Sequence, residues 1–192
     1  MNRYDLSQLG SALGLPNRFF VTREKGEQAY TLIKQALQTT PDGNPLLLEF
    51  PIQQLMDASF ADESIVRLGE GLADGQFGQR TLLLMGLTDD TVHNLNAVIH
   101  LRRLKLAFLS VEPGGKWSIV GQLEPSLHET LEIMAARRKL TAPELSDLFG
   151  LAINTASNRL KRLNDARLIR REHEVSERGL QYLYYFWDWE DG

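Results

Sequence analysis

Roughly the first 120 residues alternate short apolar runs with stretches in which apolar residues recur every three or four positions. The runs predict β-strands at 19–21, 46–50, 81–85, 107–111 and 117–120. The intervening stretches predict helices that begin after Thr22, Asp57 and Thr88, each of a residue type that caps helices. The runs at 46–50 and 81–85 are almost continuously apolar, as in strands covered on both faces. Alternating strands and helices predict right-handed βαβ units and a mixed or mostly parallel sheet.

The pattern changes near residue 123, after which strand-like runs become rare. The spacing predicts helices at about 125–138, 141–150 and 154–166, then a short strand at 168–171, a polar turn, and a last helix that opens at Ser176 and Glu177. Thr141 and Glu144 stand three residues apart as in a capping box, and Gly150 is a typical helix terminator. We therefore expect an α/β domain over residues 1–121 and a helical domain over 122–192 that ends in an aromatic C-terminal helix.

Composition and charge narrow the range of partners. The chain has 192 residues, 43% of them hydrophobic, with 21 Lys and Arg against 25 Asp and Glu, for a net charge of −4. This balance excludes a uniformly basic nucleic-acid coat and a polybasic membrane binder. The lack of cysteine excludes disulfides and thiol nucleophiles and fits a reducing compartment. No segment looks like a signal peptide or approaches the ~20 apolar residues that span a bilayer, so we expect a soluble, cytoplasmic protein that does not bind membranes.

Positive charge is nevertheless concentrated in one short segment. Residues 152–172 contain six Lys or Arg and two acidic residues, a local charge of +4, whereas 124–192 as a whole holds ten basic and twelve acidic residues. If Ala156, Leu160 and Leu163 form the core side of the third helix, its polar residues point outward. Amide and hydroxyl side chains read base edges, and cations bind phosphates. The candidate DNA contacts are Asn154, Thr155, Ser157, Asn158, Arg159, Lys161, Arg162, Arg170 and Arg171.

Residues 140–180 resemble the winged helix-turn-helix domains of bacterial regulators, especially MarR-like ones. Residues 154–163 are similar to that family's recognition helix, 167–171 to its exit into the wing, and 176–179 to the start of its post-wing helix. The wing looks short, and Ala152 stands where the family often has a hydroxyl residue. The resemblance implies a sequence-specific transcriptional regulator that binds double-stranded DNA, as a homodimer on a two-fold site. The alternative is a protein-interaction domain that has kept the fold.

Residues 18–121 resemble the STAS-like (DUF4325-type) family and, more distantly, the STAS domains of anti-sigma-factor antagonists. The resemblance rests on FVTREKGE at 20–27, LLLEF at 46–50 and MDASFADE at 56–63. In STAS antagonists an Asp and a Ser at the strand–loop–helix junction form a site that a kinase partner phosphorylates, and Asp57 and Ser59 occupy the matching places. This implies a regulatory partner such as a kinase-like ATPase. Phe60 replaces the family's following glycine, and the alternative is that Asp57 or Ser59 only caps the helix.

The remaining candidates are weaker. His93 and His100 lack a carboxylate or cysteine at metal spacing, and no assembled catalytic constellation is visible, so we expect no metal, no cofactor and no enzymatic activity. The tail from Tyr182 to Trp189 holds six aromatic residues, which either complete the core or form an interface. The leading hypothesis is a DNA-binding transcriptional regulator whose STAS-like domain receives a signal or partner. The alternative is a partner-switching or antitoxin-like module in which the winged helix docks a protein.

Overall fold

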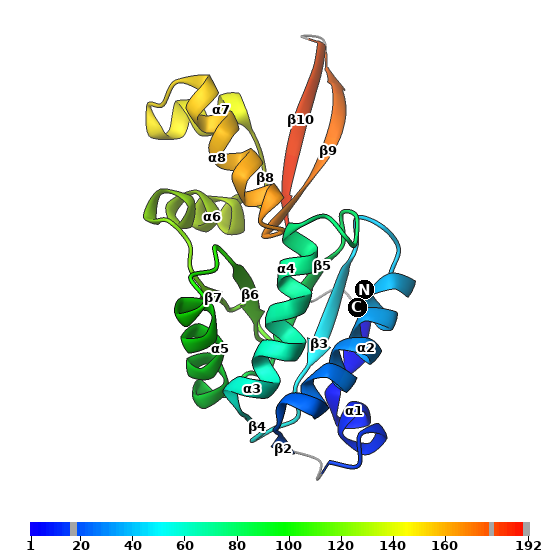
Figure 1. Ribbon diagram of the computed structural model, residues 1–192. Helices are drawn as coiled ribbons and strands as arrows, with labels where there is room; N and C mark the ends of the chain where they lie inside the picture. Colours follow the sequence, from blue (N-terminus) through cyan, green and yellow to red (C-terminus); the bar gives the residue numbers. More distant parts are fainter. Residues whose placement is uncertain (16–18, 177–178, 190–192) are drawn as a thin grey trace. The chain divides into compact units, whose positions relative to one another are not determined.

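The computed structural model describes residues 1–15, 19–176 and 179–189 (Figure 1). They form a mixed α/β structure that divides into two compact units, Met1–Gln122 together with Trp189, and Leu123–Asp188. The predicted second domain extended to residue 192, but Trp189 belongs to the first unit. Its side chain is buried there, and its indole Nε1 donates a hydrogen bond to the carbonyl of Glu112 at 3.1 Å. The chain therefore passes between the units twice.

The first unit is built on a five-stranded sheet with the strand order β1-β3-β5-β6-β7. The first four of these strands are parallel and β7 is antiparallel to β6, which confirms the predicted mixed sheet. The elements are β1 (Asn2–Asp5), α1 (Leu6–Ala12), β2 (Phe19–Phe20), α2 (Arg23–Thr39), β3 (Pro45–Glu49), β4 (Leu55–Met56), α3 (Ala58–Ala61), η1 (Asp62–Val66), α4 (Arg67–Ala73), β5 (Thr81–Met85), α5 (Asp89–Leu101), β6 (Ala107–Val111) and β7 (Trp117–Gly121).

The central strands bury both of their faces, as their continuous apolar runs predict. Leu46 and Leu48 of β3 pack in one cluster with Ile33 of α2 and other helix residues, while Leu47, on the opposite face of β3, is also fully buried. Because side chains alternate between faces along a strand, a strand covered on both sides needs apolar residues at every position.

The first unit differs from the predictions at β1, at the helix after Asp57 and at β4, a two-residue strand paired with β2 that was not predicted. The polar segment Asn2–Asp5 forms β1, an edge strand. Its polar composition does not favour a strand, and the hydrogen bonding to β3 stabilises it instead. The single helix expected to begin after Asp57 is a helical stretch with a π-helical turn, η1, between α3 and α4. A π-turn inserts an extra residue and shifts the faces that a helix presents on either side of it.

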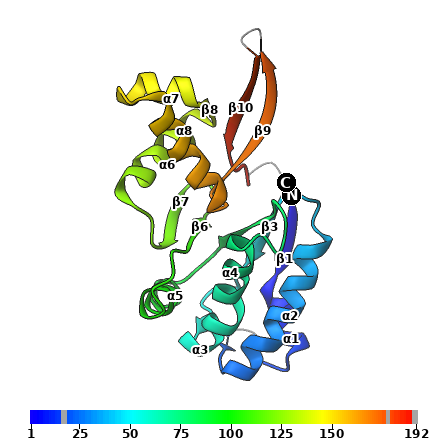
Figure 2. The same cartoon turned by 45° about the horizontal axis from the view of Figure 1, so that its top comes forward.

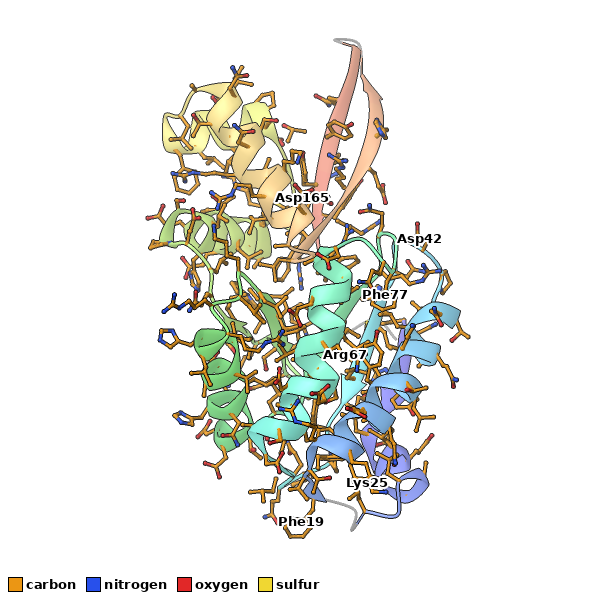
Figure 3. All side chains as sticks on the ribbon, viewed as in Figure 1. Phe19, Lys25, Asp42, Arg67, Phe77 and Asp165 are labelled. Carbon is orange, nitrogen blue, oxygen red and sulfur yellow. The ribbon has the colours of Figure 1, made fainter. Side chains whose placement is uncertain are left out.

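The second unit consists of three helices and a three-stranded antiparallel sheet with the order β8-β10-β9 (Figure 2). Its elements are α6 (Pro125–Arg137), β8 (Lys139–Thr141), α7 (Ala142–Phe149), α8 (Ile153–Asp165), β9 (Ile169–Ser176) and β10 (Gly179–Phe186). The three predicted helices are confirmed to within two residues, whereas β8 was not predicted.

The predicted last helix is wrong. Gly179–Phe186 form β10, which pairs with β9 along its whole length, and Ser176 is the last residue of β9. Glu177 lies outside the described residues. The strand expected at 168–171 is longer than predicted, because β9 and its partner β10 each have eight residues. Tyrosine and phenylalanine favour strands and form cross-strand contacts, and here they outweigh the cap-like Ser176.

The tail aromatics are divided between surface and core. Tyr184, Phe186 and Trp187 are buried, and the indole Nε1 of Trp187 donates to the carbonyl of Arg167 at 3.1 Å. Tyr182 remains 39% exposed on β10. Most of these rings therefore complete the core of the chain, and Tyr182 is left on the surface.

Candidate nucleic-acid interface

A tightly specified turn connects α7 to α8. Thr141 and Glu144 form the predicted capping box at the start of α7, and Gly150 ends the helix in the left-handed conformation at φ 62°. The hydroxyl of Ser146 then donates to the carbonyl of Leu151 at 2.6 Å across the turn. These local bonds fix the direction in which α8 leaves α7.

Helix α8 buries one side and leaves the other open. Ala156, Leu160 and Leu163 are fully buried, as predicted. With about 100° of rotation per residue, Asn154 and Asn158 lie opposite that buried stripe. The candidate residues classed as exposed on this helix are Asn154, Thr155, Asn158, Lys161 and Arg162, while Ser157 is half-buried at the edge of the face. The helix thus presents amide, hydroxyl and cationic groups together.

Arg159 is separated from this face. Its side chain is only 19% exposed; its Nη1 lies 3.9 Å from a carboxylate oxygen of Glu129 on α6, and its guanidinium carbon lies 5.7 Å from the centre of the Phe149 ring. The side chain therefore packs beside α6 and α7, and contacts within the unit explain its position.

The cations on the exposed face have carboxylate neighbours. Lys161 Nζ lies 2.6 Å from Oδ2 of Asp165, one turn further along α8. Arg162 makes two hydrogen bonds to Glu124, one of them at 2.8 Å between Nη1 and Oε2. The hydrogen bond to Glu124 raises the pKa of Arg162 above its ordinary value. Residues 123–188 contain ten Lys or Arg and ten Asp or Glu. Positive and negative side chains are therefore balanced in this unit, which has no net positive charge.

The paired strands β9 and β10 carry the other two predicted cations, each stacked on a tyrosine. The guanidinium of Arg171 lies 4.6 Å from the ring centre of Tyr182, and that of Arg170 lies 4.6 Å from the ring centre of Tyr185. Arg170 also pairs with Glu172. Stacking restricts a guanidinium to fewer conformations, so less entropy is lost when it binds a planar or anionic group.

Two exposed residues near these groups were not predicted as contacts. Ile153, the first residue of α8, is 57% exposed beside Asn154. On β9, the ring of His173 lies 4.5 Å, centre to centre, from that of Tyr182. His173 lies opposite Tyr182 in the strand register, so a strand prediction for 179–186 is the signal that would indicate it.

The second predicted site, Asp57 and Ser59, lies at the start of α3. The carboxylate of Asp57 accepts hydrogen bonds from the backbone N–H of Phe60 at 2.7 Å and of Thr22 at 2.9 Å. Thr22 has a φ of 79°, which is rare for a β-branched residue, and the bond to Asp57 helps to hold it there. Asp57 therefore caps α3 and also holds the backbone at Thr22. Ser59 is exposed in the first helical turn.

The described part of the chain lacks a cluster of metal-ligating side chains and a membrane-spanning helix. No group of three or more His, Cys, Asp or Glu side chains there could hold a metal ion. No helix within those residues is both long and apolar enough to cross a membrane. No protein-family model matches the sequence, and no curated protein matches it.

Proposed function

We propose that the protein is a sequence-specific, non-enzymatic transcriptional regulator whose second unit is a winged helix-turn-helix that binds double-stranded DNA. In this proposal α7 and α8 are the helix-turn-helix, α8 is the recognition helix, and β9 and β10 form the wing. The first unit is a STAS-like domain that receives a signal or a regulatory partner.

The observation that carries the proposal is the exposed face of α8. Asn154, Thr155 and Asn158 extend from a helix whose opposite side is fully buried, and a helix of this kind fits the major groove. Asparagine amides form paired hydrogen bonds with adenine, and the exposed Ile153 offers an apolar contact for a thymine methyl group. Lys161 and Arg171 supply phosphate contacts at two places on the unit.

The weak net charge of the second unit makes a dimer part of the proposal. With ten basic and ten acidic residues, one copy attracts the DNA backbone only weakly, so specific contacts from two copies are needed for affinity. A homodimer on two half-sites about one helical turn apart provides them. We place the protein in the cytoplasm, where it meets both DNA and a kinase-like ATPase acting near Ser59.

Enrichment of a randomised duplex library on the purified full chain tests the proposal, followed by gel-shift titrations of the selected duplex over a salt series. We expect one enriched motif, and affinity that falls as salt rises. Asn154→Ala and Asn158→Ala together should abolish the preference for that motif. Gln35→Ala removes an exposed amide from α2 of the first unit and should leave the preference intact. No enrichment, or binding that does not respond to salt, would exclude a DNA-binding function.

One observation favours a second candidate. The cations of α8 are paired with carboxylates of their own unit, which suits a mixed-charge protein surface as well as it suits DNA. In that case the second unit docks a protein, and the chain is a partner-switching or antitoxin-like module. Co-purification of a kinase-like ATPase that is displaced by Ser59→Asp, without any duplex enrichment, would favour this function.

A further inference from the structure

Glu124 forms a two-pronged ion pair with Arg162, although the two residues are 38 positions apart in the chain. Glu124 directly precedes α6, and Arg162 lies on the exposed face of α8. Both guanidinium Nη atoms donate to the carboxylate, one to each oxygen. This is the arrangement in which arginine also binds a phosphate group.

The side chain of Glu124 does not act as the cap of α6. It occupies the N-cap position, but no side-chain capping hydrogen bond is formed there, and Pro125 follows in the first turn. Proline at that position lacks one of the backbone N–H groups that a helix start leaves unpaired. The helix start is therefore compatible with glutamine at position 124.

The ion pair between Arg162 and Glu124 is also exposed enough for another anion to replace the carboxylate. The side chains of Arg162 and Glu124 are 51% and 55% exposed, and an ion pair in contact with water holds its partners only weakly. A DNA phosphate that reaches Arg162 would replace the carboxylate without opening the core.

Building on the proposed DNA-binding function, we propose that Glu124 is a built-in competitor of DNA. Its carboxylate occupies the phosphate-binding groups of Arg162 and keeps this arginine from contributing to affinity until the pair opens. The position of Glu124 suits a regulatory contact, because it stands two residues after Gln122, the last residue of the first unit before the chain enters the second. Gln122 itself is fixed in the first unit, where its backbone N–H donates to the carbonyl of Leu106 at 2.9 Å.

The full-length protein and its Glu124→Gln variant, titrated with a labelled mixed-sequence duplex over a salt series, test this inference. Glu124→Gln should bind about two- to fivefold more tightly, and its log–log salt slope should steepen by about 0.9, the value for one added phosphate contact. The matched control is Glu132→Gln, which removes a similarly exposed carboxylate from α6, at the residue beside His128. This control should change affinity by less than about twofold and leave the slope unchanged.

Arg162→Ala completes the cycle. In the Glu124→Gln background it should remove the whole gain in affinity, while in the otherwise unchanged protein it should have little effect. Equal gains for Glu124→Gln and Glu132→Gln, or a gain that survives Arg162→Ala, would overturn the inference and leave the proposed function standing. If no variant binds any duplex, both the proposed function and this inference fail. Thermal melting of each variant establishes that differences in binding do not come from unfolding.

Discussion

The ion-pair network around Arg102 in the first unit contrasts with the pair of Lys161 and Asp165 in the second. In the first, Arg102 at the end of α5 donates to Glu70 of α4 at 2.9 Å and to Asp62 of η1 at 2.8 Å, and Asp62 also lies 3.8 Å from Arg23 of α2. These pairs connect four helical segments. In the second, Lys161 and Asp165 are neighbours on one helix, and both side chains are more than half exposed.

The ion pairs of Arg102 belong to the framework of the fold, whereas the pair of Lys161 and Asp165 lies on the surface. An ion pair that joins several elements contributes to the packing of those elements, whereas a pair on one exposed helix face contributes little to stability and can be exchanged for an external anion. We therefore expect removal of the Arg102 charge to lower the free energy of unfolding, and removal of the Lys161 charge to lower affinity for DNA. Four substitutions, two of which remove a charge, test the framework role of the first unit and the surface role of α8.

The largest effect on stability is expected for Gly26→Ala in α2. A Cβ at Gly26 would lie 2.9 Å from the backbone oxygen of Phe60 and 3.0 Å from the Cβ of Glu63, so α2 would have to move away from α3 and η1. In a free helix interior this exchange stabilises by about 1 kcal/mol, but here we expect a loss of about 2–3 kcal/mol. Urea unfolding measures it, with Gln35→Ala, a solvent-facing change on the same helix, as the control. A gain in stability would show that the two helices are not in tight contact.

Asn158→Ala should have the next largest effect, on specificity alone. Loss of its amide should reduce discrimination at one base pair of the selected site by about 1–3 kcal/mol, because a paired hydrogen bond to one base is lost. Titration of a duplex series with single base-pair changes measures this, and urea unfolding should give the value of the unaltered protein. An equal loss of affinity for every duplex would instead indicate that Asn158 contacts the phosphate backbone and not a base.

Local signals made much of this structure predictable. The capping box at Thr141, the terminator Gly150 and the buried runs of β3 and β5 each depend on a few neighbouring residues, and all were predicted correctly. The exposed face of α8 also follows from local spacing, since three buried positions define the opposite side.

The features that were not predicted depend on contacts between residues far apart in the sequence. The segment Asn2–Asp5 is a strand because it pairs with β3, more than 40 positions away, and nothing in its polar composition indicates this. The cap-like Ser176 predicts a helix after it, whereas the long pairing with β9 makes Gly179–Phe186 a strand. The pairing of Glu124 with Arg162 likewise depends on how α6 and α8 pack, which spacing along one helix cannot show.

Arg102→Met tests whether the ion pairs that join elements of the first unit stabilise its fold. Asp62 and Glu70, which are 22% and 33% exposed, would lose their shared partner. Hydrogen bonds between charged groups contribute about 1.5–3 kcal/mol, but the partial exposure of Arg102 screens the interaction, so we expect a loss of about 1–2 kcal/mol. Thermal melting measures the loss, and affinity for the selected duplex should not change. Weaker DNA binding with unchanged melting would reverse the assignment of this arginine.

Lys161→Met, which should barely change stability, tests the role of the exposed ion pair on α8. Its pair with Asp165 is exposed and lies within one helix, so the free energy of unfolding should change by less than about 0.5 kcal/mol. Affinity should nevertheless fall for all duplex sequences alike, because a phosphate contact is lost and Asp165 is left to repel the backbone, and the salt slope should decrease by about 1. Lys105→Met, which removes an exposed lysine from the first unit, is the matched control and should alter neither quantity. If the two lysine variants bind equally well, α8 does not face the DNA backbone at Lys161, and the contrast between the two units would concern stability alone.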